Sequence, residues 1–233
     1  SSDQATTLSE SGYARLENKA SVAIIDLAAI GPDYIPGHAH ADTLSFELSI
    51  FGERILVNSG TSCYGTSSER VRQRGTAAHN TVMINNQDSS EVWSGFRVAR
   101  RASIISSLVE SDPPYSLRAQ GSHDGYQRLW GSPTHTRIWE LREDRFIVED
   151  RVSGKFRTAE ARYHLHPDCK INMLSENSGL IATPAKKEIR WRVFEARTNL
   201  VNTTWHPYFG KTISNKCISM NLINNYAKIE FYW

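Results

Sequence analysis

The sequence has few cysteines, no long apolar run and no excess of one charge. Only three of its 233 residues are cysteines, Cys63, Cys169 and Cys217, and this odd, widely spaced set excludes a disulfide framework and a zinc ribbon. No stretch approaches the roughly 18 consecutive apolar residues of a membrane-spanning helix. Lys+Arg 27 against Asp+Glu 25 gives a net charge of +2, which excludes a strongly basic nucleic-acid footprint. We therefore expect neither a membrane span nor a nucleic-acid partner.

Helical periodicity is also scarce. The best helical stretch is the short polar segment 67–74, which predicts at most one or two turns. Residues 1–10 contain neither the basic nor the apolar segment of a secretory signal peptide, and we interpret them as a polar leader. With 39% hydrophobic and 10% aromatic residues, the remainder, 11–233, is expected to form a single globular domain.

The apolar residues recur mostly at every second position. In the segment 43–50, Leu44, Phe46 and Ile50 share one face and polar residues occupy the other, which predicts a half-buried strand. Gly52-Glu53 then supplies a two-residue turn into a second strand over 54–57. The sequence therefore predicts a β-hairpin here.

Short β-rich segments continue to the end of the chain. The polar pair Glu143-Asp144 separates segments 137–142 and 145–150 and predicts a second hairpin. Further strands are expected over 21–27, 81–84, 99–106, 161–166, 188–194 and 228–232. Many short strands without long intervening helices favour an all-β fold, an antiparallel β-sandwich.

The densest group of candidate catalytic and metal-ligating residues lies between Gly37 and Asn80. His38, His40 and Asp42 follow one another at two-residue steps, so in extended backbone their side chains point to one face. Two imidazoles and a carboxylate are costly to bury unless a metal, hydrogen bonds or a substrate satisfies them. An isolated H-x-H pair, however, is more often a pair of surface or structural histidines.

Two later segments offer further metal ligands. Asn58 ends the second strand of the first hairpin with a side-chain oxygen, and His79 stands at the start of a predicted strand. Together with His40 they would provide two nitrogens and one oxygen, a set that suits zinc with one open position.

These segments resemble the C-terminal domain of the heparinase II/III-like polysaccharide lyases. The similarity rests on four motifs in the family's order: H-A-H-A-D-T-L-S-F-E-L, I-L-V-N-S-G-T-S-C-Y, R-G-T-A-A-H-N-T-V and S-S-E-V-W-S-G-F-R-V-A-R-R-A. It covers roughly residues 11–195. The resemblance implies an antiparallel β-sandwich that follows an N-terminal α/α toroid in full-length members, with the polysaccharide bound in the cleft between them. The toroid is expected to be missing from this chain.

The resemblance also implies an activity. Members of the family cleave uronic-acid-containing polysaccharides by β-elimination, in which a base removes the proton at C5 and the 4-linked sugar leaves. We therefore expect a polysaccharide lyase as the parent protein, an acidic polysaccharide and the toroid domain as partners, and little turnover by this chain alone. A bacterial periplasmic or cell-envelope location is expected as well. The alternative is a non-catalytic carbohydrate-binding or structural sandwich module.

The same resemblance assigns roles to individual residues. His38 matches a cleft histidine that takes part in acid–base chemistry, and His40 and His79 match zinc ligands. Asn58 stands where the family usually has Asp, so the ligand set loses a negative charge and zinc is expected to bind weakly. Tyr64 lies near a tyrosine that contributes to catalysis in some alginate-cleaving relatives.

Basic and aromatic residues are candidates for substrate contact. Trp93 and Arg97 would form a basic, aromatic surface for an acidic sugar, although a solvated strand edge fits them equally. Arg70, Arg72 and Arg74 share one face if their segment is extended, and Arg74 is taken as a substrate-binding candidate. The remaining histidines are interpreted as structural or surface residues: His123, His135, His164, His166 and His206.

Overall fold

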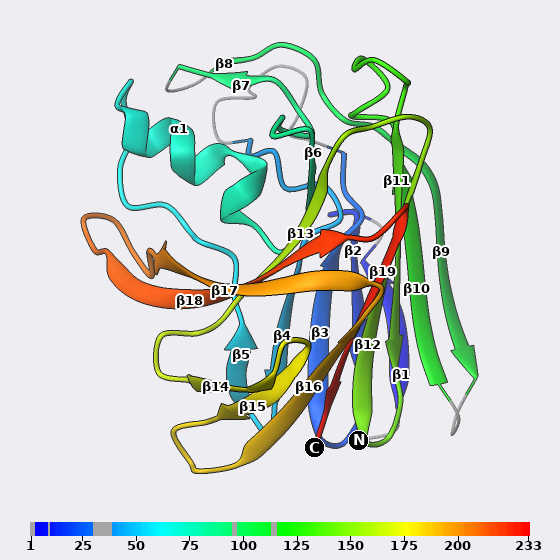
Figure 1. Ribbon diagram of the computed structural model, residues 1–233, viewed down its shortest axis with the longest axis vertical. Helices are drawn as coiled ribbons and strands as arrows, with labels where there is room; N and C mark the ends of the chain where they lie inside the picture. The colour runs from blue at the N-terminus through cyan, green and yellow to red at the C-terminus, as the bar shows by residue number, and fades with distance from the viewer. Residues whose placement is uncertain (1–2, 9, 30–38, 95–96, 113–115) are drawn as a thin grey trace.

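The computed structural model describes residues 3–8, 10–29, 39–94, 97–112 and 116–233, and antiparallel strands dominate it (Figure 1). A five-stranded sheet holds the first five strands in chain order. They are β1 (Gln4–Leu8), β2 (Tyr13–Glu17), β3 (Ser21–Asp26), β4 (Phe46–Ile50) and β5 (Glu53–Leu56). Strand β1 comes from the segment interpreted as a polar leader, and it pairs with β2 at the sheet edge.

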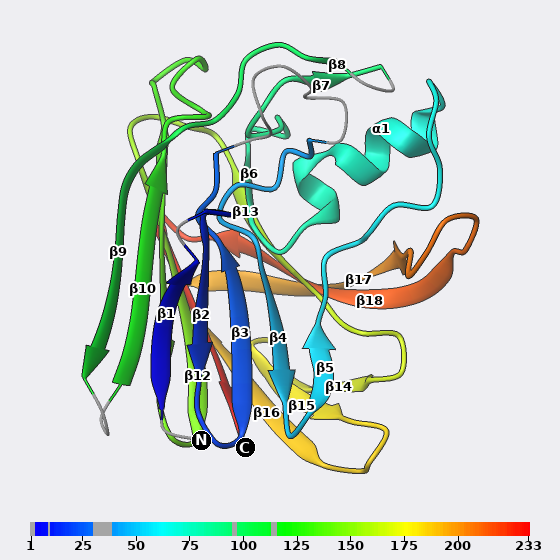
Figure 2. The same ribbon diagram turned by 180° about the vertical axis from the view of Figure 1, so that it is seen from behind.

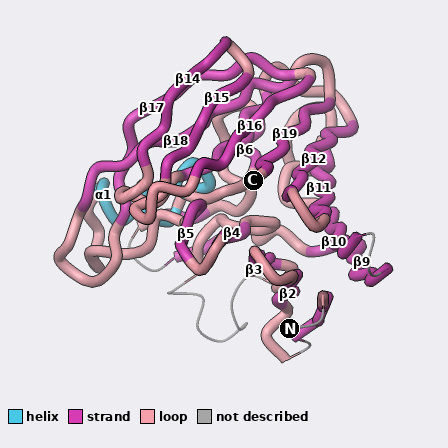
Figure 3. The backbone as a smooth tube through the Cα atoms, turned by 90° about the horizontal axis from the view of Figure 1, so that it is seen from below, coloured by secondary structure: helices cyan, strands magenta, loops and turns pink. Residues whose placement is uncertain are grey.

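An eight-stranded sheet has the order β14-β15-β16-β19-β12-β11-β10-β9. Its strands are β9 (Ile104–Asp112), β10 (Ser116–His123), β11 (Thr134–Leu141), β12 (Arg145–Ser153), β14 (Lys170–Ser175), β15 (Ser178–Ala182), β16 (Glu188–Phe194) and β19 (Tyr226–Tyr232). Figure 3 shows this sheet curving around one side of β2 to β5. The predicted antiparallel β-sandwich is confirmed.

A four-stranded sheet and a short hairpin complete the strands that the structure describes. The sheet has the order β17-β18-β13-β6. Its strands are β6 (Val82–Ile84), β13 (Ala159–His164), β17 (Ala196–Trp205) and β18 (Ile213–Leu222), and the hairpin is β7 (Val92–Trp93) with β8 (Arg97–Val98). In the described ranges, no helix is long and apolar enough to cross a membrane.

Two short helical segments lie at one end of the sandwich. Helix α1 (Ser68–Arg74) begins after Ser67, whose side chain accepts a hydrogen bond from the backbone N–H of Arg70, as an N-cap residue does. A 3₁₀ turn, η2 (Thr76–Ala78), follows. Figures 1 and 2 show α1, β7 and β8 at the end opposite the two chain termini.

Aromatic rings fill the core between the sheets. Phe46 of β4 lies 5.6 Å from Phe146, 6.1 Å from Tyr163 and 6.5 Å from Trp139, measured between ring centroids. All four side chains are buried, and tilted or edge-to-face contacts of this kind add to the free energy of apolar burial. Phe46 therefore joins the two sheets through the alternating face that the sequence predicts.

The first hairpin is confirmed, but its turn lies one residue earlier than predicted. Ile50 pairs with Glu53, so Phe51 and Gly52 form the turn, with φ values of 55° and 78°. Two consecutive positive φ values are typical of a type I′ turn. The prediction of Gly52-Glu53 is wrong because this turn places glycine second.

The second hairpin is confirmed with its predicted bend, since the Arg142 N–H donates to the Arg145 carbonyl across the pair at 143–144 (2.9 Å). The strand predicted over 99–106 starts later than expected, because β9 begins at Ile104.

A buried ionic network crosses the eight-stranded sheet. The Asp150 carboxylate accepts hydrogen bonds from Arg137 Nε (2.7 Å), Arg137 Nη2 (2.9 Å), His135 Nε2 (2.7 Å) and the Tyr163 hydroxyl (3.1 Å). Burial alone would raise the pKa of Asp150, but Arg137 and His135 lower it well below its usual range. Arg137 Nη1 also donates to the carbonyls of Leu44 and Asn80.

His164 has the structural role that the sequence predicts, and it makes stability depend on pH. Its Nε2 lies 3.1 Å from the Ala77 carbonyl and its Nδ1 lies 3.3 Å from Thr203 Oγ1. Burial, then the nearby Arg162 and His79, lower its pKa from 6.5 to about 3. The unfolded chain therefore binds a proton that the folded chain does not, and stability is lost as the pH falls from about 6.5 towards 3.

We expect His164 to contribute about 1.4 kcal/mol per pH unit to this loss, or about 2 kcal/mol between pH 6.5 and pH 5. Urea unfolding of wild type and of His164→Gln across this range measures the slope, which should decrease by about one proton in the variant. Equal slopes would show that His164 titrates alike in the folded and unfolded states.

Candidate active site and metal centre

Three chain segments meet at the end of the sandwich that carries α1. The segment before β4 is fixed to the end of α1, because the Ala41 N–H donates to the Arg74 carbonyl and Thr76 Oγ1 donates to the Ala41 carbonyl (both 2.8 Å). The segment after β5 lies beside the 3₁₀ turn, since the Ser59 N–H donates to the Ala78 carbonyl (3.0 Å). These hydrogen bonds bring residues far apart in sequence into one site.

His40, Asp42 and His79 are placed so that they could hold a metal ion, and we call these three residues the metal-binding group. One ligand atom from each lies within 4.8 Å of the others. His40 Nδ1 faces His79 Nε2 at 3.2 Å, and the two rings meet edge to face. Two imidazole nitrogens and a carboxylate oxygen are a ligand set that suits zinc. The residues present therefore fit a divalent cation, with His40, Asp42 and His79 as its ligands.

Arg70 acts on the same histidine from the other side. Arg70 Nη1 lies 3.3 Å from His40 Nε2 and 3.3 Å from Thr61 Oγ1. Because a guanidinium only donates, His40 Nε2 accepts and His40 Nδ1 carries the proton that faces His79. A metal ion on His40 Nδ1 would move this proton to Nε2, towards the arginine. Arg70 therefore opposes metal binding, and Asp42 favours it.

The Asn58 side chain, the predicted third metal ligand, makes hydrogen bonds to two other segments. Its Oδ1 accepts a hydrogen bond from the Asn80 N–H (2.9 Å), and its Nδ2 donates to Ser45 Oγ (3.3 Å). The amide thus holds the backbone next to His79, and Asp42 supplies the oxygen of the metal-binding group. Because the Asn58 oxygen is already engaged by a backbone donor, Asp42 is the better placed of the two to supply a ligand oxygen.

An acidic pocket adjoins Asp42. It has a volume of about 220 Å³, and Tyr13, Asp26 and Glu47 are among its lining residues. Burial, then the Asp42 charge, raise the pKa of Asp26 to about 8. Asp26 therefore holds its proton at a higher pH than an exposed carboxyl group does.

The two predicted catalytic residues differ in what the structure shows of them. His38 lies outside the described residues. Tyr64 is 50% exposed, and the Arg70 guanidinium lies 5.2 Å from the centre of its ring. Arg70 therefore contacts both Tyr64 and the metal-binding group. The sequence pattern named Arg70 only as a member of the series Arg70, Arg72 and Arg74, although positions 70 and 74 share one face of a helix as well.

The short helical segment expected over 67–74 is confirmed as helix α1, so Arg70, Arg72 and Arg74 do not share the face of an extended segment. Arg74 is fully buried, and it donates to the carbonyls of Ala39 (3.0 Å), Ser94 (3.0 Å) and Arg97 (3.4 Å). Its guanidinium is thus used to hold the segment before β4 against the β7–β8 hairpin. This geometry favours a positioning role for Arg74 over direct contact with a substrate.

Trp93 and Arg97 form the basic, aromatic surface that the sequence predicts. They are partners across the β7–β8 hairpin, and the Arg97 guanidinium lies 4.8 Å from the centre of the Trp93 ring. Trp93 is 49% exposed. The pair therefore presents a stacked ring and cation to solvent at the same end of the sandwich as α1 (Figure 1).

Comparisons with known proteins place these observations in a family. The family model for the heparinase II/III-like C-terminal domain matches residues 2–229, whereas a search of curated proteins found no match. A solved heparinase III, the BT4657 gene product, has a TM-score of 0.79 and 17% identity, with 99% of this chain and 36% of that chain covered.

Two further solved structures have the same or a related fold. The heparan sulfate lyase HepC from Pedobacter heparinus has a TM-score of 0.77 and 17% identity over 98% of this chain and 36% of that chain. A 4-alpha-glucanotransferase from Thermococcus litoralis has a TM-score of 0.53 and 12% identity over 99% and 39%. The chain thus spans little more than a third of these proteins. Its motifs, its sandwich and the match over residues 2–229 show that it belongs to the heparinase II/III-like C-terminal domain family.

Proposed function

We propose that this chain is the β-sandwich part of a polysaccharide lyase that cleaves a uronic-acid polymer by β-elimination. The observation that carries the proposal is the meeting of His40, Asp42, His79 and Arg70 beside the exposed Tyr64, in a chain of this family. An acidic polysaccharide fits the cations Arg70 and Arg97 near this end of the molecule. A bacterial periplasmic or cell-envelope location agrees with such a substrate.

The proposed roles follow from the chemistry of each group. Removal of the C5 proton needs a base, and departure of the 4-linked oxygen needs an acid; we assign these steps to His38 and Tyr64 together with groups of the N-terminal domain. A bound divalent cation would supply a local positive charge that fixes the loop before β4. His40, Asp42 and His79 would hold this cation. Arg74 would position the same segment through its hydrogen bond to the Ala39 carbonyl.

The N-terminal toroid is the proposed partner of this chain. The matched heparinases are almost three times as long as the part that this chain covers, and acid, base and uronate-neutralising groups must all surround the same sugar for efficient elimination. The second candidate function is a non-catalytic carbohydrate-binding module. Asn58 decides for neither function, because it lacks the charge of the family's usual Asp while Asp42 offers a carboxylate nearby.

The test of the proposed function is elimination itself. Protein that carries the N-terminal domain should form unsaturated uronate product from heparan sulfate or alginate, measured by ultraviolet absorbance, and this chain alone should form little or none. A full-length protein that binds these polymers without cleaving any of them would support the binding module instead.

The metal-binding group makes a second, independent prediction. Zinc affinity, measured by competition with a chromogenic chelator, should fall by more than about a hundredfold in His40→Ala and in Asp42→Asn, because each loses a ligand. Arg70→Gln should bind zinc more tightly than wild type, since an opposing cation is removed.

Asn58→Asp is the control that separates the two ligand sets. If Asn58 were the third ligand, Asn58→Asp would raise zinc affinity strongly and Asp42→Asn would leave it unchanged. That result would return the site to the set that the sequence predicts, whereas no zinc binding by any variant would assign His40 and His79 to a hydrogen-bond network.

A further inference from the structure

Three exposed aromatic residues lie in two neighbouring segments beside the candidate site, and two of their rings are in contact. Tyr64 lies between β5 and α1, and Tyr208 and Phe209 lie in the turn between β17 and β18. Their exposed fractions are 50%, 64% and 65%. The Tyr64 and Phe209 rings lie 5.6 Å apart with a tilt of 30°. We call these three residues the aromatic patch; clustered large rings on a surface are typical of a binding site.

The backbone holds this turn firmly against the segment after β5. The His206 N–H donates to the Ser59 carbonyl and the Gly210 N–H donates to the Ser62 carbonyl, both at 2.7 Å. Gly60, with φ 74°, allows the close approach, because a Cβ there would lie 2.2 Å from the His206 carbonyl oxygen. The two ends of the turn are thus fixed, and Tyr208 and Phe209 lie between them.

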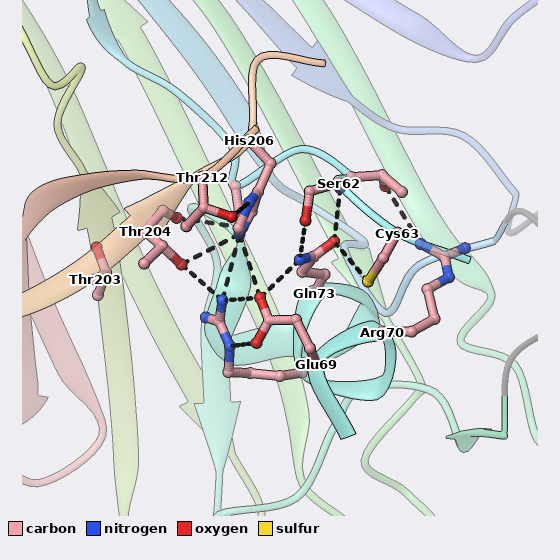
Figure 4. Close-up of polar contacts among 12 residues, drawn as sticks. Ser62, Cys63, Glu69, Arg70, Gln73, Thr203, Thr204, His206 and Thr212 are labelled. Atoms are coloured by element: carbon pink, nitrogen blue, oxygen red, sulfur yellow. Dashed lines mark hydrogen bonds and ion pairs between the residues drawn. The ribbon is translucent and has the colours of Figure 1, made fainter. Parts of the chain in front are cut away.

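Side chains of α1 fix the turn from the other side, as Figure 4 shows. Arg72 donates to Thr204 Oγ1 (2.6 Å) and lies 3.3 Å from His206 Nε2, while Glu69 binds both Arg72 and Gln73. Burial lowers the pKa of His206, so its neutral ring accepts from Arg72. The aromatic patch therefore has a fixed position relative to α1, and through α1 to the candidate site.

The patch continues directly into the metal-binding group. Tyr64 contacts the Arg70 guanidinium, and Arg70 contacts His40 Nε2 at 3.3 Å. Lys211 is exposed two residues after Phe209, and its backbone N–H donates to the Tyr208 carbonyl (3.1 Å). An aromatic face offers a surface to the apolar C–H face of a pyranose ring, and a neighbouring ammonium group pairs with a carboxylate or sulfate on that sugar.

We propose that Tyr208 and Phe209 form a stacking subsite for a pyranose ring of an acidic polysaccharide, next to the sugar that lies at the candidate site. Lys211 pairs with the anionic group of the stacked sugar. This subsite rests on the proposed function, which places the sugar that reacts near His40. It adds residues that bind a neighbouring sugar of the same polymer, away from the bond that is cleaved.

The test is calorimetric titration of this chain with hexasaccharides of heparan sulfate, of alginate and of cellulose. Phe209→Ala should weaken binding of an acidic hexasaccharide about fivefold to tenfold, the range expected for one aromatic contact. The double variant Tyr208→Ala with Phe209→Ala should weaken binding of the acidic hexasaccharide further. Phe209→Trp, which keeps an aromatic ring at this position, should bind with wild-type affinity. Lys211→Ala should weaken the acidic ligands and leave cellohexaose unchanged.

Trp130→Ala is the matched control. Trp130 is 73% exposed and lies in the β10–β11 connection, where it lines a different pocket with Asn85, Asn86, Arg157 and Thr158. Its removal should leave oligosaccharide affinity unchanged. Thermal melting of each variant checks folding, and exposed substitutions of this kind should change the free energy of unfolding by less than about 0.5 kcal/mol.

The outcomes separate this inference from the proposed function. Tight binding of an acidic hexasaccharide that Phe209→Ala leaves unchanged would overturn the stacking subsite and leave the proposed function intact. Binding of cellohexaose alone, lost in Phe209→Ala, would support stacking and contradict an acidic substrate. Absence of binding to all three hexasaccharides, or an equal loss in Trp130→Ala, would overturn the subsite.

Discussion

Replacing Asp150 with alanine is expected to lower the free energy of unfolding by about 3–5 kcal/mol. The reason is that Asp150 is fully buried and is the counterion of the equally buried Arg137. Removal of the carboxylate leaves a guanidinium in the core without its charge partner, and His135 and Tyr163 lose their acceptor as well. Urea unfolding at neutral pH measures the change.

Asp144→Ala is the matched control for this experiment. Asp144 also pairs with an arginine, Arg145 at 2.9 Å, but on the surface, where water screens the ion pair. Its loss should change the free energy of unfolding by less than about 1 kcal/mol. Equal effects of Asp150→Ala and Asp144→Ala would contradict the idea that the buried network determines stability.

The second large effect is expected in catalysis. In protein that carries the N-terminal domain, His38→Ala should reduce the turnover of a uronate polymer by about 10²–10⁴-fold, the usual contribution of a positioned acid or base. The expectation comes from the sequence motif that places His38 two residues before the metal-binding His40. Initial rates of unsaturated uronate formation at saturating polymer measure it.

His166→Ala controls for the general loss of a histidine. His166 is partly exposed and lies against Trp205, with ring centroids 4.6 Å apart, and the proposed mechanism does not use it. Its variant should retain nearly full turnover, and both variants should melt close to wild type. A decrease of less than tenfold in His38→Ala would remove this residue from the acid–base steps.

Local patterns predicted the strands that have one apolar face. The alternation around Phe46 and the polar bend after Arg142 reflect the side-chain period of a strand, which the sequence shows directly. The long β17–β18 hairpin was not predicted, because its strand Ala196–Trp205 carries five Asn and Thr residues and shows no regular apolar alternation. That hairpin is defined by its pairing within the four-stranded sheet and by its contacts with α1, neither of which a local window contains.

The candidate site was predicted in part. The sequence pointed to His40 and His79, and the structure brings both into the metal-binding group. It could not show that the oxygen of Asn58 is used by the Asn80 N–H, since that contact joins segments 22 residues apart. The short helix over 67–74 was expected and is confirmed as α1, but the contact of Arg70 with His40 joins segments 30 residues apart and could not be read from a local pattern.

The position of β19 has a consequence for biosynthesis. This strand is translated after every other strand of the eight-stranded sheet, yet it lies inside that sheet, paired with β12 on one side and β16 on the other. Until Tyr226–Tyr232 leave the ribosome, both neighbours present open edges that can pair with other nascent chains. The eight-stranded sheet therefore cannot close until β19 has been translated, and chaperone supply or growth temperature should affect the yield of soluble protein.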